Sequence, residues 1–237
     1  MTLDKATPLL AVGPGVVALP LSVAPRIQRV VERALSVAWR EVQKRIDVKT
    51  ESEAAITTEL TNALNRYLDD PLKPVSGFSG STFETIQRGG ETQNYNGSHI
   101  EKRPDLTIRL GGRRSGVAID RAQNGIFVEC KILDSTHSLL DYCKHGVARF
   151  VIGDYAWAMT HAMMVAYVRD ASQSAEVLAR HLTGDEYACA DCGAVILDRP
   201  SRGDRVIETR HRRAWRYPQT SGEPGHITLV HLWLLVD

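Results

Sequence analysis

The 237-residue chain has only four cysteines, no long apolar run and almost no excess charge of either sign. The cysteines are too few and too scattered for a disulfide framework, so we expect a reducing, cytoplasmic setting. No stretch reaches the roughly eighteen continuous apolar residues of a membrane-spanning helix, and we therefore expect no membrane partner. A net charge of +1 provides no general attraction to a polyanion. A nucleic-acid-binding surface has to come from a local concentration of positive charge.

Arginine is concentrated in two stretches of the chain. Seven arginines lie between positions 199 and 216, and a second basic cluster spans positions 102–114. The mixture of arginine with Trp215 and Tyr217 suits phosphates and stacked bases, although a solvated basic strand has the same composition. The residues that we predict to bind nucleic acid are Arg103, Arg113, Arg114, Arg212, Arg213 and Arg216.

Apolar spacing predicts two helices ahead of a group of strands. Residues 25–47 begin with Pro25 and have helical spacing, and residues 51–68 form a second amphipathic segment, for which Thr50 is the expected cap. Alternating and β-branched segments predict strands at 84–87, 105–110 and 126–133, with a further candidate at 113–120.

The second half of the chain continues the alternation. We expect a helix at 135–146 closed by Gly146, a helical stretch at 153–162, a strand at 163–170, a helix at 174–184 and strands at 205–210 and 226–237. This order predicts an α/β protein with a central mixed β-sheet flanked by helices. We expect a single domain of residues 1–237, made of an N-terminal segment and helix (1–48), a core (49–170) and an arginine-rich extension (171–237).

The apolar segment "GIFVECKIL" carries two charged residues in its middle, Glu129 and Lys131. Side chains alternate along a strand, so both face one side while Cys130 faces the other. A neighbouring strand that opens with Pro104 and Asp105 brings a second carboxylate to the same place. Two close carboxylates repel each other, and a hard divalent ion with oxygen ligands removes the repulsion. Mg²⁺ suits this arrangement because it binds through one or two carboxylates plus water and phosphate.

Context separates this acid-x-Lys triplet from a chance occurrence. Asp47-Val48-Lys49 has the same spacing, but it lies where a helix ends and no Pro-Asp strand precedes it. The triplet at 129–131 has β-branched and aromatic flanks and a Pro-Asp strand upstream. The alternative interpretation is a surface salt bridge of Glu129 with Asp105, Lys131 or a nearby arginine.

The pattern "RPDLTI…FVECK" resembles the signature of the PD-(D/E)XK nuclease superfamily, through Pro104, Asp105, Glu129 and Lys131. The resemblance implies a restriction-endonuclease-like core in the order α-β-β-β-α-β. It also implies that Asp105 and Glu129 hold the metal, with the backbone carbonyl of Cys130 as a further ligand. Lys131 would orient or help to deprotonate the attacking water and neutralise charge in the transition state.

Members of this superfamily often add an acidic residue from the helix before the first strand. That helix offers Glu51, Glu53 and Glu59, and at 100° per residue only Glu53 lies within the apolar stripe. We therefore include Glu53 among the catalytic residues. The alternative for Glu53 is a favourable acid in the first turn of the helix.

The resemblance implies a Mg²⁺-dependent endonuclease, with Mn²⁺ as a substitute, that acts on DNA in bacterial restriction or anti-phage defence. Cutting both strands needs two active sites, so we expect a homodimer or a subunit of a larger defence complex. One alternative is a catalytically inactive nucleic-acid-binding subunit. Another is a zinc-stabilised module around Cys189 and Cys192, which we do not favour because no second C-x-x-C pair is present.

Three further residues have both a functional and a structural interpretation. Arg149 and Tyr155 follow the motif strand and could approach a phosphate, but we favour a core role for the aromatic residue and a solvated position for Arg149. His231, in an apolar segment, is expected to be a hydrogen-bonded core histidine.

Overall fold

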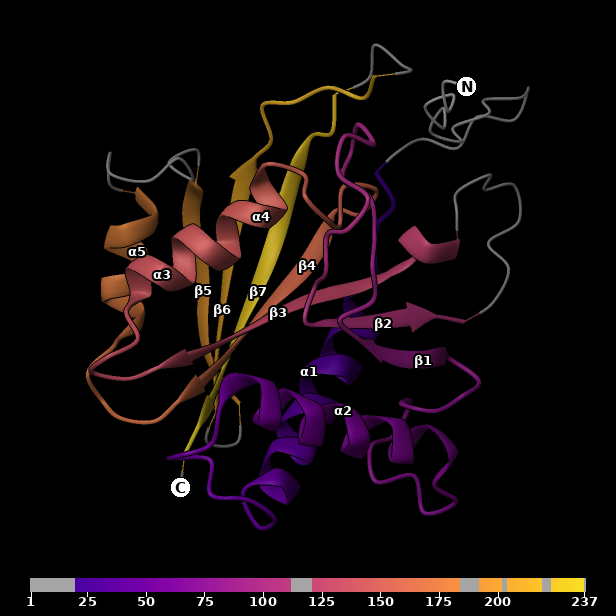
Figure 1. Ribbon diagram of the computed structural model, residues 1–237, viewed down its shortest axis with the longest axis vertical. Coiled ribbons are helices and arrows are strands. Elements are labelled where there is room, and N and C mark those ends of the chain that lie inside the picture. The colour runs from indigo at the N-terminus through magenta and orange to yellow at the C-terminus, as the bar shows by residue number, and fades with distance from the viewer. Residues whose placement is uncertain (1–19, 112–120, 184–191, 202–203, 219–222, 237) are drawn as a thin grey trace, which may run out of the picture.

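The computed structural model describes residues 20–111, 121–183, 192–201, 204–218 and 223–236. Its strands are β1 (Phe83–Arg88), β2 (Leu106–Leu110), β3 (Gly125–Leu133), β4 (His161–Val168), β5 (Cys192–Ser201), β6 (Asp204–Arg212) and β7 (His226–Leu235). They form one seven-stranded sheet in the order β1-β2-β3-β4-β7-β6-β5 (Figure 1). The pairs β3–β4 and β4–β7 are parallel and the others are antiparallel, so the sheet is mixed.

The segment 171–237, which we separated as an arginine-rich extension, supplies three strands of this sheet. Strand β7 lies between β4 and β6 and pairs along its length with both. Its side chains are buried from Ile227 to Leu234 apart from Thr228. The extension therefore belongs to the same core as the motif strand.

The helices are α1 (Pro25–Val42), α2 (Glu53–Asp69), α3 (Leu139–Tyr142), α4 (Ala148–Val151) and α5 (Ala175–Thr183), with a π-helical segment at Cys143–Val147 and a short 3₁₀ helix at Arg121–Gln123. Figure 1 shows α1 and α2 side by side and apart from α3, α4 and α5. None of the helices in the described ranges has the length and apolar character needed to cross a membrane.

Contacts with β4 and β7 show that the two groups of helices cover opposite faces of the sheet. Trp39 of α1 stacks on Tyr167 of β4, with ring centroids 5.3 Å apart. Tyr142 of α3 meets His231 of β7, which is paired with Met164 of β4. Because positions 164 and 167 are an odd number of residues apart on one strand, their side chains point to opposite faces.

Most of the elements expected from the sequence are confirmed. The first two helices, the strands at 84–87, 105–110 and 126–133 and the strands at 163–170, 205–210 and 226–237 all have counterparts. The cap of α2 is Ser52, whose hydroxyl accepts the Ala55 N–H at 3.2 Å, and not Thr50. Strand β5 was not expected, and the candidate strand at 113–120 lies outside the described residues.

Two predictions for the segment after β3 are wrong. The helix does not stop at Gly146, because the π-helical segment carries it on to Val151. Gly146 is instead a point of close approach, since a Cβ there would lie 2.4 Å from Cε of Met164. The expected helix at 153–162 is a series of turns, because Gly153 and Ala156 have φ values of 80° and 55°, which a right-handed helix does not allow.

Candidate nuclease site

The site forms where β3 continues past the end of β2. The strands are paired from Arg109↔Gly125 to Leu106↔Val128, so the last residues of β3 have no strand beside them on that side. Two carboxylates accept hydrogen bonds from the backbone N–H groups there. The Cys130 N–H donates to Oδ2 of Asp105 at 2.8 Å, and the Ile132 N–H donates to Oε2 of Glu53 at 3.2 Å.

Lys131 lies at the centre of this group. Its Nζ is 3.0 Å from Oε1 of Glu129, 3.2 Å from Oε1 of Glu53 and 3.8 Å from Oδ2 of Asp105. Nζ also donates to the carbonyl oxygen of Cys130 at 2.8 Å. The structure therefore brings together all the catalytic and metal-ligating residues that we predicted. Of the three acids considered in the sequence, Glu53 contacts β3, with its side chain 34% exposed, whereas Glu51 is exposed and Glu59 is paired with Arg45.

The competing triplet Asp47-Val48-Lys49 has a local structural role. A side-chain oxygen of Asp47 accepts the backbone N–H of Lys49 at 3.1 Å, and the other accepts the hydroxyl of Thr50 at 2.9 Å. Asp47 thus stabilises the turn after α1. The strand context of the motif was the feature that distinguished the two triplets.

Glu129 is held by two residues that we had not placed in the site. Its side chain is 1% exposed. Oε1 accepts from Nη1 of Arg149 at 3.0 Å, and Oε2 accepts from the hydroxyl of Tyr155. The core position expected for Tyr155 is confirmed. Arg149 is partly solvated, with its side chain 40% exposed, but its guanidinium is also paired with Glu129, because a buried carboxylate needs a cation beside it.

The charges of the cluster shift one another's ionisation. Burial and the neighbouring Asp105 raise the pKa of Glu129 to about 7, against the opposing effect of Lys131, Arg149 and Tyr155. Burial lowers the pKa of Lys131, but the three surrounding carboxylates outweigh burial and raise the pKa above its usual value. Three carboxylates therefore share two cations, and the cluster is one positive charge short when all five groups are ionised.

The donor set suits a hard divalent cation. Its members are carboxylate oxygens and one backbone carbonyl, which are the ligands that Mg²⁺ accepts. Within the described ranges, no group of three or more His, Cys, Asp or Glu side chains is arranged so that it could hold a metal ion. The ammonium of Lys131 is the group that the oxygens surround here. A metal ion at this place would have to displace it from some of its contacts.

The predicted nucleic-acid-binding arginines divide into different environments. Arg103 is exposed and paired with Glu91, and Arg216 is exposed and paired with Glu223. Arg212 is exposed at the end of β6. Arg113 and Arg114 lie outside the described residues.

Arg213 does not bind nucleic acid from a solvated surface, and this prediction is wrong. Its side chain is 4% exposed, and its guanidinium donates to backbone carbonyls of two loops. Nη1 is 3.1 Å from the carbonyl oxygen of Met159, and Nη2 donates to that of Pro224. The guanidinium therefore joins the loop before β4 to the loop before β7.

The aromatic residues next to Arg213 also pack inside the protein. Trp215 stacks on Tyr95 with ring centroids 4.4 Å apart, and Tyr217 is buried, with its hydroxyl on the carbonyl of Trp157 at 2.8 Å. They are therefore already engaged, and the base-stacking role is not supported. His231 is buried and hydrogen-bonded to Tyr142 and Thr209, as expected of a core histidine.

The cysteines provide no zinc site among the described side chains. Cys130 and Cys143 are buried and are not joined in a disulfide. Cys189 lies outside the described residues, and Cys192 is described only as the first residue of β5.

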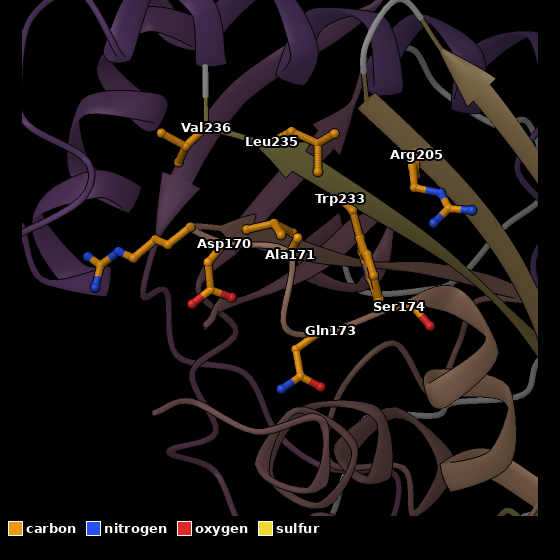
Figure 2. Close-up of a pocket in the computed structure, with 10 residues that line it drawn as sticks. Asp170, Ala171, Gln173, Ser174, Arg205, Trp233, Leu235 and Val236 are labelled. Atoms are coloured by element: carbon orange, nitrogen blue, oxygen red, sulfur yellow. The ribbon is translucent and has the colours of Figure 1, made fainter. Parts of the chain in front are cut away.

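A cavity of about 450 Å³ lies at the end of β4 and β7 (Figure 2). Glu53, Asp105 and Glu129 are not among the residues that line it. Trp233 and Leu235 line it on one side, and the connection from Asp170 to Ser174 lines it on another. Arg169, which also lines the cavity, is committed to the carbonyl of Val48 at 2.9 Å. We find no convergent set of reactive groups in this cavity.

Comparisons of the chain with protein-family models, curated proteins and solved structures found no match. The site is therefore interpreted from its own geometry.

Proposed function

We propose that this protein is a divalent-metal-dependent nuclease that hydrolyses phosphodiester bonds in DNA. The observation that carries the proposal is the convergence of Glu53, Asp105 and Glu129 on Lys131 at the free edge of β3. The resemblance to the PD-(D/E)XK superfamily supports it, since these residues occupy the motif positions. The order α2, β1, β2, β3, then α3 and α4, then β4 agrees with a restriction-endonuclease-like core.

Each residue has a defined task in this proposal. Asp105 and Glu129 hold Mg²⁺ or Mn²⁺, with the carbonyl of Cys130 as a further oxygen ligand and Glu53 at the same edge. A divalent ion held by these residues would supply Lewis-acid stabilisation of the negative charge that develops on the phosphate and would make water more acidic. Lys131 donates hydrogen bonds that orient the attacking water and offset charge on the phosphate oxygens.

The structural interpretation of the cluster is that carboxylates merely cap the free amides of β3. Such caps would require only Asp105 and Glu53, each of which accepts one backbone N–H. They do not account for a buried glutamate at position 129 that needs three side-chain partners. Burying a charge in this way is costly, and such costs are typical of functional sites.

The defence role and the assembly as a homodimer or as part of a larger complex remain parts of the proposal that follow from the resemblance. An inactive nucleic-acid-binding subunit is the competing function. A nuclease should cleave nucleic acid and need Lys131 to do so, whereas an inactive subunit should bind nucleic acid without cleaving it.

The test is incubation of the purified protein with supercoiled plasmid, linear duplex, single-stranded DNA and RNA, in Mg²⁺ or in EDTA. We expect cleavage of DNA in Mg²⁺ that EDTA stops. Lys131→Ala should abolish cleavage and leave binding nearly intact, and the control Lys49→Ala, in the competing triplet, should cut normally. Unchanged cutting by Lys131→Ala would refute the assignment, and binding without any cutting by the natural protein would favour the inactive subunit.

A further inference from the structure

A polar cavity of about 490 Å³ opens beside Glu129. It is lined by Glu101, Lys102, Arg103, Arg149, Asp154 and Tyr155. Two of these residues, Arg149 and Tyr155, are the ones that hold the Glu129 carboxylate. The cavity is therefore adjacent to the carboxylate cluster, and Arg149 forms part of the wall between them.

Each of the three cations that line the cavity is paired with a carboxylate. Nζ of Lys102 is 2.9 Å from Oδ2 of Asp154, and Arg103 is paired with Glu91. The positive charges of Lys102 and Arg103 are thus offset by neighbouring carboxylates, which weakens their attraction for an anionic ligand. Arg149 differs from both because its partner, Glu129, lies behind it in the carboxylate cluster.

Within the described residues, Nη1 is the one side-chain nitrogen of Arg149 that donates hydrogen bonds to other protein groups. Nη1 donates to Oε1 of Glu129 at 3.0 Å and to the hydroxyl of Tyr155 at 3.1 Å. In the described part of the chain, Nε and Nη2 have no side-chain or backbone acceptor. The side chain is 40% exposed, so these donors are open to a ligand.

The backbone around Arg149 is shaped to bring it there. The π-helical segment Cys143–Val147 directly precedes α4, and such segments occur frequently at functional sites. Gly146 in that segment lies next to both neighbouring strands, since its Cβ would be 2.4 Å from Cε of Met164 in β4 and in ordinary contact with Cγ of Glu129 in β3, at 3.7 Å. The π-helical segment and Gly146 together therefore determine where α4 places Arg149 relative to Glu129.

We propose that Arg149 binds a phosphate group of the nucleic-acid strand through Nε and Nη2 while Nη1 stays on Glu129. This inference rests on the proposed nuclease function and names a further substrate-binding residue for it. A guanidinium is the group suited to this double contact, because its planar fork can hold a carboxylate on one side and phosphate oxygens on another. With all groups ionised, the five charges sum to one negative. Without a divalent ion the phosphate contact therefore depends on the Arg149 guanidinium itself, and a bound divalent ion would make the sum one positive and strengthen the attraction for an anion.

The experiment measures the binding of a short fluorescent DNA duplex by anisotropy, in EDTA, over a range of salt concentrations. Arg149→Gln removes the charge, and its amide nitrogen, which takes the position of Nε, does not reach Glu129. We expect it to weaken binding about 10- to 100-fold, as for the loss of a charge-assisted hydrogen bond. We also expect the slope of log K against log salt to become shallower by about 0.9, as for one lost phosphate contact.

Three other variants distinguish a direct contact of Arg149 with phosphate from an indirect effect on the structure of the site. Arg149→Lys should restore the salt slope. Tyr155→Phe, which leaves the charge in place, should keep the natural slope. The matched control is Arg66→Ala, because Arg66 is similarly exposed, at 43%, and paired with Glu41. It lies about 20 Å along α2 from Glu53 and should bind normally.

The inference fails if Arg149→Gln binds with the natural affinity and salt slope, or if Tyr155→Phe flattens the slope as much as Arg149→Gln does. Thermal unfolding of each variant shows that the comparison is made on folded protein. If Mg²⁺-dependent cutting requires Lys131 while Arg149→Gln keeps the natural slope, only the phosphate contact is refuted. If the natural protein cuts no nucleic acid but Arg149→Gln flattens the slope, only the nuclease function is refuted.

Discussion

Removing the ammonium of Lys131 should destabilise the metal-free protein and strengthen its response to Mg²⁺. Three carboxylates lie within 3.8 Å of Nζ, and the Lys131 side chain is only 18% exposed. Removal of one partner of a buried ion pair costs about 3–5 kcal/mol. Glu129 can take up a proton in response, because its pKa is already raised to about 7. We therefore expect Lys131→Ala to lose about 2–3 kcal/mol of unfolding free energy in EDTA at neutral pH.

Mg²⁺ should reverse much of this loss. A ligand that binds only the folded state at a hundred times its Kd stabilises it by about 2.7 kcal/mol. In the natural protein the ion has to displace Lys131 from the carboxylates, whereas in Lys131→Ala it meets them without a competitor. The stabilisation by Mg²⁺ should therefore be larger in the variant than in the natural protein.

The assay is thermal or urea unfolding of the natural protein, Lys131→Ala and Asp105→Asn, in EDTA and in a Mg²⁺ series. For a chain of this size, 2–3 kcal/mol corresponds to a Tm change of about 4–12 °C. Asp105→Asn should show a reduced response to Mg²⁺ because a ligand is lost. Lys49→Ala is the control and should behave as the natural protein does. If Mg²⁺ stabilises none of these proteins, or stabilises Asp105→Asn fully, the carboxylates do not form a metal site.

Three other perturbations test separate parts of the structure. Glu53→Gln should lower kcat about 10- to 100-fold in a plasmid-cleavage assay, while Glu59→Gln on the same helix should not; equal rates would remove Glu53 from the site. Gly146→Ala should cost up to about 1 kcal/mol in urea unfolding, because the atom nearest to the added methyl is the flexible end of Met164, which can move aside; a loss of about 3 kcal/mol or more would show that Met164 cannot shift. Burial lowers the pKa of His211 to about 4 and of His231 to about 3, so both are neutral when folded. Their stabilisation is complete above about pH 6.5 and is lost as the pH falls below it, by up to about 2 kcal/mol per histidine at pH 5. The raised pKa of Glu129 has the opposite effect over this range, so the measurement is made on Glu129→Gln, and an unfolding free energy of that variant that stays constant from pH 7 to 5 would rule this out.

The parts of the site that could be predicted are those with a local sequence signature. Glu129 and Lys131 are separated by one residue on a strand, so alternation alone places them on the same face. Glu53 follows from helical periodicity, since its angular position relative to the apolar stripe can be calculated. Asp105 needed the expectation that two strands are neighbours, which the pairing of β2 with β3 confirms.

Arg149 and Tyr155 could not be placed in this way. We expected the helix to end at Gly146, and a π-helical segment changes the angular position of every residue after it. The pairing of Arg149 with Glu129 therefore could not be derived from a periodicity of 3.6 residues per turn. Arg213 was misplaced for a related reason: its acceptors are backbone carbonyls as far as 57 residues away, and backbone carbonyls leave no pattern in the sequence.

The Pro-Asp pair at the start of β2 has a physical explanation in this geometry. If the register Leu106↔Val128 is continued by two residues, Pro104 falls opposite Cys130. A proline has no N–H to donate to the Cys130 carbonyl, which accepts a hydrogen bond from Nζ of Lys131 instead, and the ladder ends at this point. The side chain of Asp105 then accepts the Cys130 N–H that the ladder leaves free. The same step that shortens β2 thus brings a carboxylate to Lys131, because a longer β2 would satisfy the amides of β3 with backbone carbonyls and leave no place for Asp105 or Glu53.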